Sequence, residues 1–225
     1  MDFNKKRVVI TGASSGIGLA IAKLLISRGA IVYSLDLHKP GKNVPGLRFF
    51  RCDVSNSTEV KRALGLVSGK IDILISNAGV MRRGRLLDSS EKDFDLLMGV
   101  FIRGSWLLVK YAQPKLRDNA IVAFVSSVHG FSLDATPGVY SLSKASIISL
   151  FRILDKGYNE YDFRLIAPGP VDTPLARYGK TRAEYNKNNR IRRSPEFIAN
   201  LILRLFNTKK KSLLYDSKRE MYYFQ

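Results

Sequence analysis

Tyr140 and Lys144 stand four residues apart, in a segment whose pattern predicts a helix over residues 139–156. Residues at i and i+4 share one face of a helix, so the phenol and the ammonium are expected to lie side by side. A phenol with a pKa near ~10 is a poor base at neutral pH, but a nearby ammonium favours the phenolate. The pair could therefore release or take up a proton under mild conditions. A Tyr-x-x-x-Lys pair alone is common, and the assignment needs support from other residues.

Two serines stand where a partner for this pair is expected. Residues 121–126 read as a buried strand, and Ser126 and Ser127 lie at its end. Active-site groups of open parallel sheets collect at the carboxyl ends of the strands. A serine hydroxyl at this place could hold a substrate oxygen for Tyr140.

A glycine-rich turn, Thr-Gly-Ala-Ser-Ser-Gly-Ile-Gly, joins a predicted strand at Arg7–Thr11 to a predicted helix over residues 17–28. Glycines permit the tight turn and let the backbone approach a pyrophosphate, and the helix N-terminus offers free N–H groups. Asp36 ends the next strand 18 residues after Gly18. This strand–turn–helix context favours a dinucleotide site over a turn without a ligand.

The residues near Asp36 indicate which dinucleotide is bound. A carboxylate there can accept hydrogen bonds from both ribose hydroxyls of NAD, and it repels the extra phosphate of NADP. Neither Leu37 nor Ser15 supplies a positive charge for that phosphate. We therefore expect NAD as the cofactor, with NADP disfavoured.

Strand-like and helical segments alternate along the chain, which predicts an α/β fold with a doubly wound, Rossmann-type parallel sheet and helices on both faces. One domain over residues 1–225 is the simplest organisation. The predicted strands are Arg7–Thr11, Ile31–Asp36, 49–54, Ile71–Ser76, 121–126, 163–167 and 212–215. The predicted helices are 17–28, 57–67, 90–116 (as two helices, with Ser90 as the first cap), 139–156 and 195–206. The polar, basic segment 184–193 is predicted to be mobile.

Taken in order, these motifs resemble those of a short-chain dehydrogenase/reductase, over roughly residues 7–173. The residue pair Asp53-Val54, the triplet Asn77-Ala78-Gly79 and the segment from Pro168 to Thr173 match further family motifs. Ser127 precedes Tyr140 by the usual family interval of thirteen residues, which favours it over Ser126. The cofactor-binding residues that the resemblance implies are Gly12, Ser14, Ser15, Gly16, Ile17, Gly18, Asp36, Leu37, Asp53, Val54, Asn77, Ala78, Gly79, Tyr140, Lys144, Pro168, Gly169, Val171 and Thr173.

The resemblance implies an NAD-dependent oxidoreductase that interconverts a small-molecule alcohol and a ketone or aldehyde. Ser127 would orient the substrate oxygen and Tyr140 would exchange its proton. Lys144 would lower the pKa of the tyrosine and hold the nicotinamide ribose. The hydride would pass directly between the nicotinamide and the substrate, while the protein supplies position and electrostatics.

Two departures from the family pattern stand out. Phe101 occupies the place of an asparagine that, in the family, helps to anchor a proton-relaying water. Its side chain cannot hydrogen-bond, so the alternative to an active enzyme is a dinucleotide-binding sensor or scaffold with weak or no catalysis. Ser105 and Asn119 are the polar residues nearby in sequence that could replace the asparagine. The C-terminal part also differs from the family, and residues 174–194 form a short substrate-side loop.

The formal net charge of +18 raises the question of nucleic-acid binding. The basic residues are spread along the chain without interleaved aromatic residues, so we expect a basic surface and no specific nucleic-acid partner. Residues 177–193 are predicted to be a solvated charge run, with attraction of an acidic substrate as the alternative.

The remaining residues suggest bulk properties. Cys52 is the single cysteine, which excludes an internal disulfide and fits a reducing compartment. No apolar stretch is long enough for a membrane span or a signal peptide. We therefore expect a cytoplasmic protein. His38 and His129 lack metal-spaced partners, so no metal site is expected, and His129 could line the substrate pocket. The resemblance implies a homodimer or homotetramer through residues 93–116 and 139–156, where the apolar candidates are Trp106, Leu107, Ile148 and Phe151.

Overall fold

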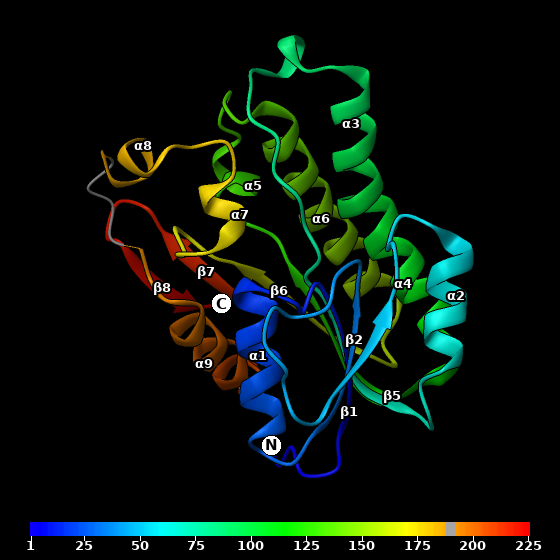
Figure 1. The fold of residues 1–225 in the computed structure, drawn as a ribbon. Helices are drawn as coiled ribbons and strands as arrows, with labels where there is room; N and C mark the ends of the chain where they lie inside the picture. The colour runs from blue at the N-terminus through cyan, green and yellow to red at the C-terminus, as the bar shows by residue number, and fades with distance from the viewer. Residues whose placement is uncertain (188–191) are drawn as a thin grey trace.

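The strands of the protein form one sheet in the order β3-β2-β1-β4-β5-β6-β7-β8, in a computed structural model that describes residues 1–187 and 192–225. All neighbouring strands run parallel except β7 and β8. The strands are β1 (Arg7–Thr11), β2 (Ile31–Asp36), β3 (Leu47–Arg51), β4 (Ile71–Ser76), β5 (Leu116–Val125), β6 (Asp162–Ala167), β7 (Ser212–Asp216) and β8 (Met221–Phe224). This confirms the predicted α/β fold with a doubly wound, mostly parallel sheet (Figure 1).

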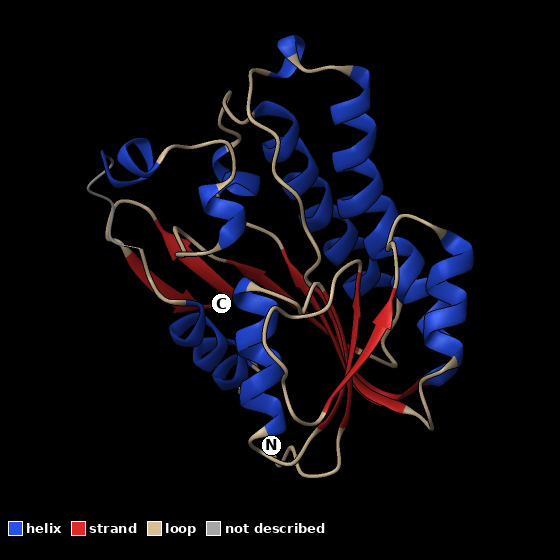
Figure 2. Cartoon of the chain, in the orientation of Figure 1, coloured by secondary structure: helices blue, strands red, loops and turns tan. Residues whose placement is uncertain are grey.

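Helices cover both faces of the sheet (Figure 2). The longer ones are α1 (Gly16–Ile26), α2 (Ser57–Gly65), α3 (Glu91–Met98), α4 (Gly104–Ala112), α6 (Gly138–Gly157) and α9 (Pro195–Leu205). Shorter segments are α5 (His129–Ser132), α7 (Pro174–Arg177), α8 (Arg182–Lys187), the 3₁₀ turns η1 (Leu86–Asp88) and η3 (Gln113–Lys115), and the π-helical turn η2 (Gly99–Arg103).

Two hydrophobic cores follow from the alternation of side chains along the buried strands. Val8 and Ile10 pack with α1 and α9 on one face, and Val9 packs with α2, α4 and α6 on the other. All three side chains are buried. Helices thus pack on both faces of the sheet. The carboxyl ends of its strands remain uncovered by these cores, and functional groups can gather there.

Most predicted elements agree with the structure to within a few residues. The Ser90 cap is confirmed, because its hydroxyl accepts a hydrogen bond from the Asp93 N–H at 3.1 Å. The third strand ends at Arg51 rather than 54, since the Asp53 carboxylate is bound by Ser55 in a turn. Of the predicted mobile segment, residues 184–187 belong to α8 and residues 188–191 lie outside the described residues.

Two features of the structure were not predicted. The stretch predicted as two helices up to 116 is continuous from α3 through the π-turn η2 into α4, and Leu116 already begins β5. The last strand, β8, pairs antiparallel with β7 after a turn in which Glu220 has φ of +50°. The aromatic residues of β8 favour a strand, but a run of four residues does not indicate its partner or its direction.

The apolar residues suggested for an oligomer interface differ in how far they are buried. Leu107, Ile148 and Phe151 are buried in the chain's own core, so the prediction was wrong about their availability to a partner, whereas Trp106 on α4 is 45% exposed. Within the part of the chain that the structure describes, no helix is both long and apolar enough to span a bilayer.

Candidate active site

A cavity of about 1010 Å³ opens at the carboxyl ends of the central strands. Its wall combines the glycine turn after β1 with residues from the ends of β2, β4, β5 and β6 and from α6. All of the predicted site residues line this cavity except Gly18. The topology therefore brings together segments more than a hundred residues apart in sequence.

Gly18 instead packs α1 against the turn. A Cβ atom there would lie 2.2 Å from the Gly12 carbonyl oxygen, which only glycine avoids. Gly12 itself has φ of +69°, and its own added Cβ would lie 2.7 Å from the Ala78 Cα. Gly18 thus lets α1 approach the turn and does not border the cavity, so a cofactor contact at this residue stays a prediction.

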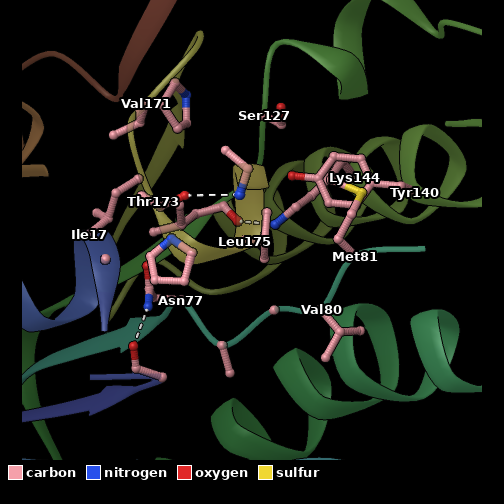
Figure 3. Close-up of a pocket in the computed structure, with 18 of the residues that line it drawn as sticks. Ile17, Asn77, Val80, Met81, Ser127, Tyr140, Lys144, Val171, Thr173 and Leu175 are labelled. Atoms are coloured by element: carbon pink, nitrogen blue, oxygen red, sulfur yellow. Dashed lines mark hydrogen bonds between the residues drawn. The ribbon is translucent and has the colours of Figure 1, made fainter. Parts of the chain in front are cut away.

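Asn77 braces the glycine turn from the neighbouring strand. Its Nδ2 donates to the carbonyl oxygens of Thr11 and Gly12, both at 3.0 Å, while its backbone N–H donates to the Thr11 hydroxyl. Figure 3 shows this side chain below the cavity, with a dashed line to the turn. Asn77 thus positions the turn as well as bordering the cavity.

The glycine turn has the features of an anion-binding site, called the cradle below. Ser15, the N-cap of α1, makes no side-chain hydrogen bond to the first turn of the helix, so those N–H groups face the cavity without a capping hydroxyl. A helix N-terminus of this kind favours a phosphate group. The shape and the donors fit a dinucleotide pyrophosphate.

Asp36 lies at the end of β2 beside the cradle. Its carboxylate accepts backbone hydrogen bonds from Ser14 at 3.0 Å and from His38 at 3.1 Å, which fix its orientation. Leu37 is exposed at the rim and carries no charge. Lys39, which is not among the predicted site residues, also lines the cavity and brings a positive charge to it.

Asp53 and Val54 extend the wall after β3. The Asp53 carboxylate accepts from the Ser55 N–H at 2.9 Å and from its hydroxyl at 2.7 Å. Val54 packs against Gly104 of α4, where an added Cβ would approach the valine to 3.0 Å. Cys52 beside them is buried, and burial raises the pKa of its thiol to about 12, as expected of a packing residue.

Tyr140 and Lys144 lie on one face of α6 and point into the cavity wall (Figure 3). Both are buried, with 6% and 4% of their surface exposed. The Lys144 ammonium donates to the Val125 carbonyl at 2.9 Å. The two serines after β5 take different roles: Ser126 donates to the Lys144 carbonyl at 2.7 Å, whereas Ser127 is a hydrogen-bonding neighbour of the tyrosine hydroxyl.

Burial controls the protonation of both groups. It raises the pKa of Tyr140 to about 12, opposed by the hydrogen bond with Ser127 and the positive charge of Arg83. It lowers the pKa of Lys144 to about 7. Arg83 thus adds a positive charge near the tyrosine. The Lys144 ammonium lies 5.7 Å from the centroid of the Tyr140 ring, and its role in lowering the pKa of the tyrosine stays a prediction.

Phe101 fills the space beside these two side chains. Its ring lies edge-on to the Tyr140 ring, with centroids 5.5 Å apart, and the Lys144 ammonium lies 4.1 Å from its centroid. The π-turn η2 carries the residue, and such turns often occur at functional sites. The lysine is therefore held by a carbonyl and an aromatic face.

Neither polar residue near Phe101 in sequence takes its place in the site. Ser105 is buried, and its hydroxyl donates to the Phe101 carbonyl at 2.5 Å. Asn119 lies near the start of β5, at the opposite end of the strand from Ser127, and its N–H donates to the Glu160 carbonyl.

The segment after β6 closes the cavity beside the glycine turn. Thr173 caps α7 through a hydrogen bond from the Ala176 N–H at 3.2 Å, and its methyl group lies close to Gly16. The Gly169 N–H donates to the Tyr222 hydroxyl at 3.1 Å, and an added Cβ there would collide with the Tyr215 ring. Tyr222 belongs to the unpredicted strand β8, so only the fold reveals its support of this segment.

The opposite end of the cavity has a mixed wall. Apolar side chains come from Val80, Met81 and Leu175 (Figure 3). Polar and charged groups come from His129, Ser132, Asp134, Arg83, Lys180, Tyr185, Arg192 and Glu220. The segment 177–193, predicted as a solvated charge run, thus contributes two basic residues to the cavity, while Arg177 is paired with Asp172 at the surface.

The comparison with known families decides the assignment. The family described as short chain dehydrogenase matches residues 6–184. The chain belongs to the short-chain dehydrogenase/reductase family. An oxidoreductase UcpA from Salmonella typhimurium is 37% identical over 188 residues, which cover 76% of this chain and 71% of that protein. An uncharacterized oxidoreductase from Thermotoga maritima is 37% identical over 186 residues, covering 77% and 74%.

Solved structures of the short-chain dehydrogenase/reductase family share the fold. One from Burkholderia phymatum, in complex with NAD, has a TM-score of 0.82 at 24% identity, covering 95% of this chain and 90% of the other. One from Burkholderia cenocepacia, in complex with NADP, has a TM-score of 0.83 at 20% identity, covering 97% and 91%. The aldohexose dehydrogenase of Thermoplasma acidophilum, in ligand-free form, has a TM-score of 0.80 at 26% identity, covering 90% and 87%. The chain therefore shares the fold of these proteins and belongs to a family of oxidoreductases.

Proposed function

We propose that this protein, acting as one catalytic domain over residues 1–225, is an NAD-dependent oxidoreductase that interconverts an alcohol and a ketone or aldehyde, with Tyr140 as its general acid/base. The observation that carries the proposal is the position of the Tyr140 hydroxyl. It lies beside Ser127 in the wall of the cavity that the glycine turn also borders. A proton-transfer group and a dinucleotide cradle thus share one site.

In the proposed complex, NAD supplies or accepts the hydride. The glycine turn and the N-terminus of α1 bind its pyrophosphate, and Asp36 binds the adenosine ribose. Val171 and Thr173 would contact the carboxamide of the nicotinamide ring, and Lys144 would hold the nicotinamide ribose. These contacts fix the reacting ring relative to Tyr140.

During reduction, Ser127 donates a hydrogen bond to the substrate carbonyl oxygen and aligns it with the phenol. As hydride reaches the carbonyl carbon, the Tyr140 O–H bond breaks and a new O–H bond forms on the substrate. The apolar side chains of Met81 and Leu175 border the same end of the cavity and can contact the carbon skeleton of the substrate. Oxidation of the alcohol follows the same path in reverse.

The preference for NAD rests on Asp36. Its carboxylate is ordered by two backbone N–H groups and would repel a phosphate on the ribose. Lys39 is the group that could favour NADP instead, because it lines the same cavity three residues further on. The family includes proteins solved with either cofactor, so the preference is tested with both.

A second candidate function is dinucleotide binding with little turnover. The observation that favours it is Phe101, whose ring and the Val125 carbonyl hold the Lys144 ammonium. A lysine held in this way has less freedom to take part in proton movement. Tight NADH binding without turnover on a broad substrate panel would favour this second function.

The proposed activity is tested by following NADH and NADPH absorbance with a panel of ketones, aldehydes and sugars, and NAD reduction with the matching alcohols. We expect turnover with at least one carbonyl substrate and a preference for NADH. A panel without any turnover, together with NADH binding, would contradict the catalytic proposal.

We also propose a homodimer or homotetramer. Exposed apolar side chains on the two long helices, Trp106 of α4 with Leu142 and Ile153 of α6, are available for such contacts. Light scattering of the purified protein tests this proposal, and a monomer at micromolar concentration would contradict it.

A further inference from the structure

Tyr140 must recover a proton after each reduction, and its surroundings restrict the source. The side chain is buried, and burial raises its pKa to about 12, so the phenolate left after proton donation is strongly basic. A phenolate of this kind cannot persist into the next cycle. A second group therefore has to connect it with solvent.

Lys144 is poorly placed for this connection. Its ammonium donates to the Val125 carbonyl at 2.9 Å and rests on the Phe101 ring. Phe101 is only 1% exposed, so the ring separates the lysine from water on that side and cannot pass a proton. The lysine thus faces a carbonyl that already accepts a hydrogen bond and an apolar ring, and its remaining side borders the part of the cavity where the cofactor would bind.

His129 approaches Tyr140 from the other side. Their rings meet edge to face, with centroids 6.0 Å apart and an interplanar angle of 78°. The histidine side chain is 29% exposed and lines the cavity, so it contacts both the tyrosine and solvent. Its own backbone N–H donates to the Ser127 hydroxyl at 3.3 Å, which ties it to the catalytic serine.

Asp134 fixes the orientation of this ring. Its Oδ2 lies 2.5 Å from His129 Nδ1 and also accepts a hydrogen bond from the Ser132 hydroxyl at 3.0 Å. A carboxylate at Nδ1 keeps the proton on that nitrogen. Nε2 is then the nitrogen that takes up and releases a proton.

We propose that His129, oriented by Asp134, carries the proton between Tyr140 and solvent during turnover. After the Tyr140 O–H bond breaks and the substrate O–H bond forms, the imidazolium Nε2–H bond breaks and the phenol O–H bond is restored. The neutral ring then takes a proton from solvent. Alcohol oxidation moves the proton in the opposite direction. The inference rests on the proposed function and assigns a second proton-transfer group to the same site.

The charge environment of His129 comes from several elements. Asp134 follows its own short helix, and Tyr140 and Lys144 come from α6. Arg83 comes from the loop after β4, Lys180 and Arg192 from the segments on either side of α8, and Glu220 from the turn before β8. Arg83 lowers the pKa of the tyrosine, which assists the phenolate, while among the described residues it is Asp134 that is bonded to the histidine ring.

The first test is spectroscopic and needs no substrate. The chain has two histidines, so the ¹⁵N ring signals of the His38→Gln variant belong to His129. We expect the Nδ1–H tautomer of the neutral ring, and loss of that preference in His38→Gln/Asp134→Asn. An Nε2–H tautomer in the first variant would overturn the proposed geometry.

The second test measures turnover. His129→Gln is expected to lower kcat by roughly 10²-fold, the usual contribution of a proton-transfer group, with the Kd for NADH unchanged. Added imidazole should restore activity to His129→Gly in proportion to its concentration. Asp134→Asn should lower kcat less and shift the acid limb of the pH profile of kcat. Phe131→Leu, on the same short helix but outside the cavity wall, should behave as the wild type.

Two results would overturn the proposal while the proposed function stands. One is wild-type kcat and an unchanged pH profile in His129→Gln. The other is a loss of kcat that imidazole does not restore and that leaves the pH profile unchanged, as a purely structural role would produce. A wild-type protein that binds NADH without turnover would instead overturn the proposed function, and this inference with it.

Discussion

The Lys144 ammonium lies 4.1 Å from the centroid of the Phe101 ring. A cation over an aromatic face in a desolvated site is stabilised by about 2 kcal/mol. The contact partly offsets the cost of burial, which lowers the pKa of the lysine to about 7. The candidate active site therefore contains a lysine held by an aromatic ring, and the half-buried His129 contacts Tyr140 from the other side.

The first prediction concerns the close packing of the Phe101 ring on the backbone of Gly79. A Cβ atom on Gly79 would lie 2.8 Å from the Phe101 ring, which Tyr140 and Lys144 hold on its other sides. Gly79→Ala should lower the free energy of unfolding by about 1–3 kcal/mol, the cost of overpacking. Denaturant unfolding measures the change.

The control for this prediction uses the same substitution elsewhere. Gly157 has nothing within 4 Å of an added Cβ, so Gly157→Ala should be neutral or slightly stabilising. In a Phe101→Leu background, Gly79→Ala should cost less than in the wild type, as a double-mutant cycle would show. Equal costs in the two backgrounds would mean that the ring is not the obstacle.

The buried lysine makes stability depend on pH. The folded protein releases the Lys144 proton near pH 7, whereas the unfolded chain keeps it up to an ordinary pKa of 10.5. Between these values the unfolded state binds more protons, so the free energy of unfolding should rise with pH, by at most about 1.4 kcal/mol per pH unit. Above about pH 9 the raised pKa of the buried Cys52 thiol acts in the opposite direction.

Urea unfolding of the wild type and of Lys144→Met at pH 7, 8 and 9 tests this dependence. The methionine variant keeps the apolar stem and removes the ammonium, so its stability should rise less over this range. Parallel curves for the two proteins would show that the lysine does not titrate in this window.

The third prediction concerns cofactor choice. Asp36→Asn removes the negative charge while keeping an oxygen that can accept from the Ser14 N–H. The ratio of kcat/KM for NADH to that for NADPH should fall at least about tenfold, which corresponds to about 1.4 kcal/mol. Steady-state kinetics with both cofactors gives this ratio.

Lys39→Gln is the matched comparison for Asp36→Asn. It should weaken NADPH binding with little effect on NADH, because the lysine would meet only the extra phosphate. If Asp36→Asn leaves the ratio unchanged, the carboxylate does not select the cofactor.

The sequence predicts the central fold well and the packing of the site incompletely. β1, β2 and β4 match their predicted bounds because strands buried on both faces are continuous apolar runs. The motif order also places Ser127, Tyr140 and Lys144 in one cavity. Such features depend on local pattern and on the edge at which parallel strands end.

Features that depend on tertiary contacts could not be predicted in this way. The contact of Phe101 with Lys144 occurs across α3–α4 and α6, and the π-turn that carries it leaves no simple periodic signal. Gly18 reads as part of a phosphate motif, although its role is to let α1 approach the turn. The pairing of His129 with Asp134 could have been suspected from their spacing of five residues only with knowledge of the turn between them.

The measurement that tests the central claim most directly is a comparison of wild type with Tyr140→Phe on the best carbonyl substrate. The variant lacks only the phenolic oxygen, and NADH fluorescence titration checks that the cofactor site is intact. The proposed mechanism predicts a loss of kcat of at least about 10²-fold with the Kd for NADH changed less than about threefold. A variant that retains wild-type kcat would contradict the role of Tyr140 and the mechanism built on it.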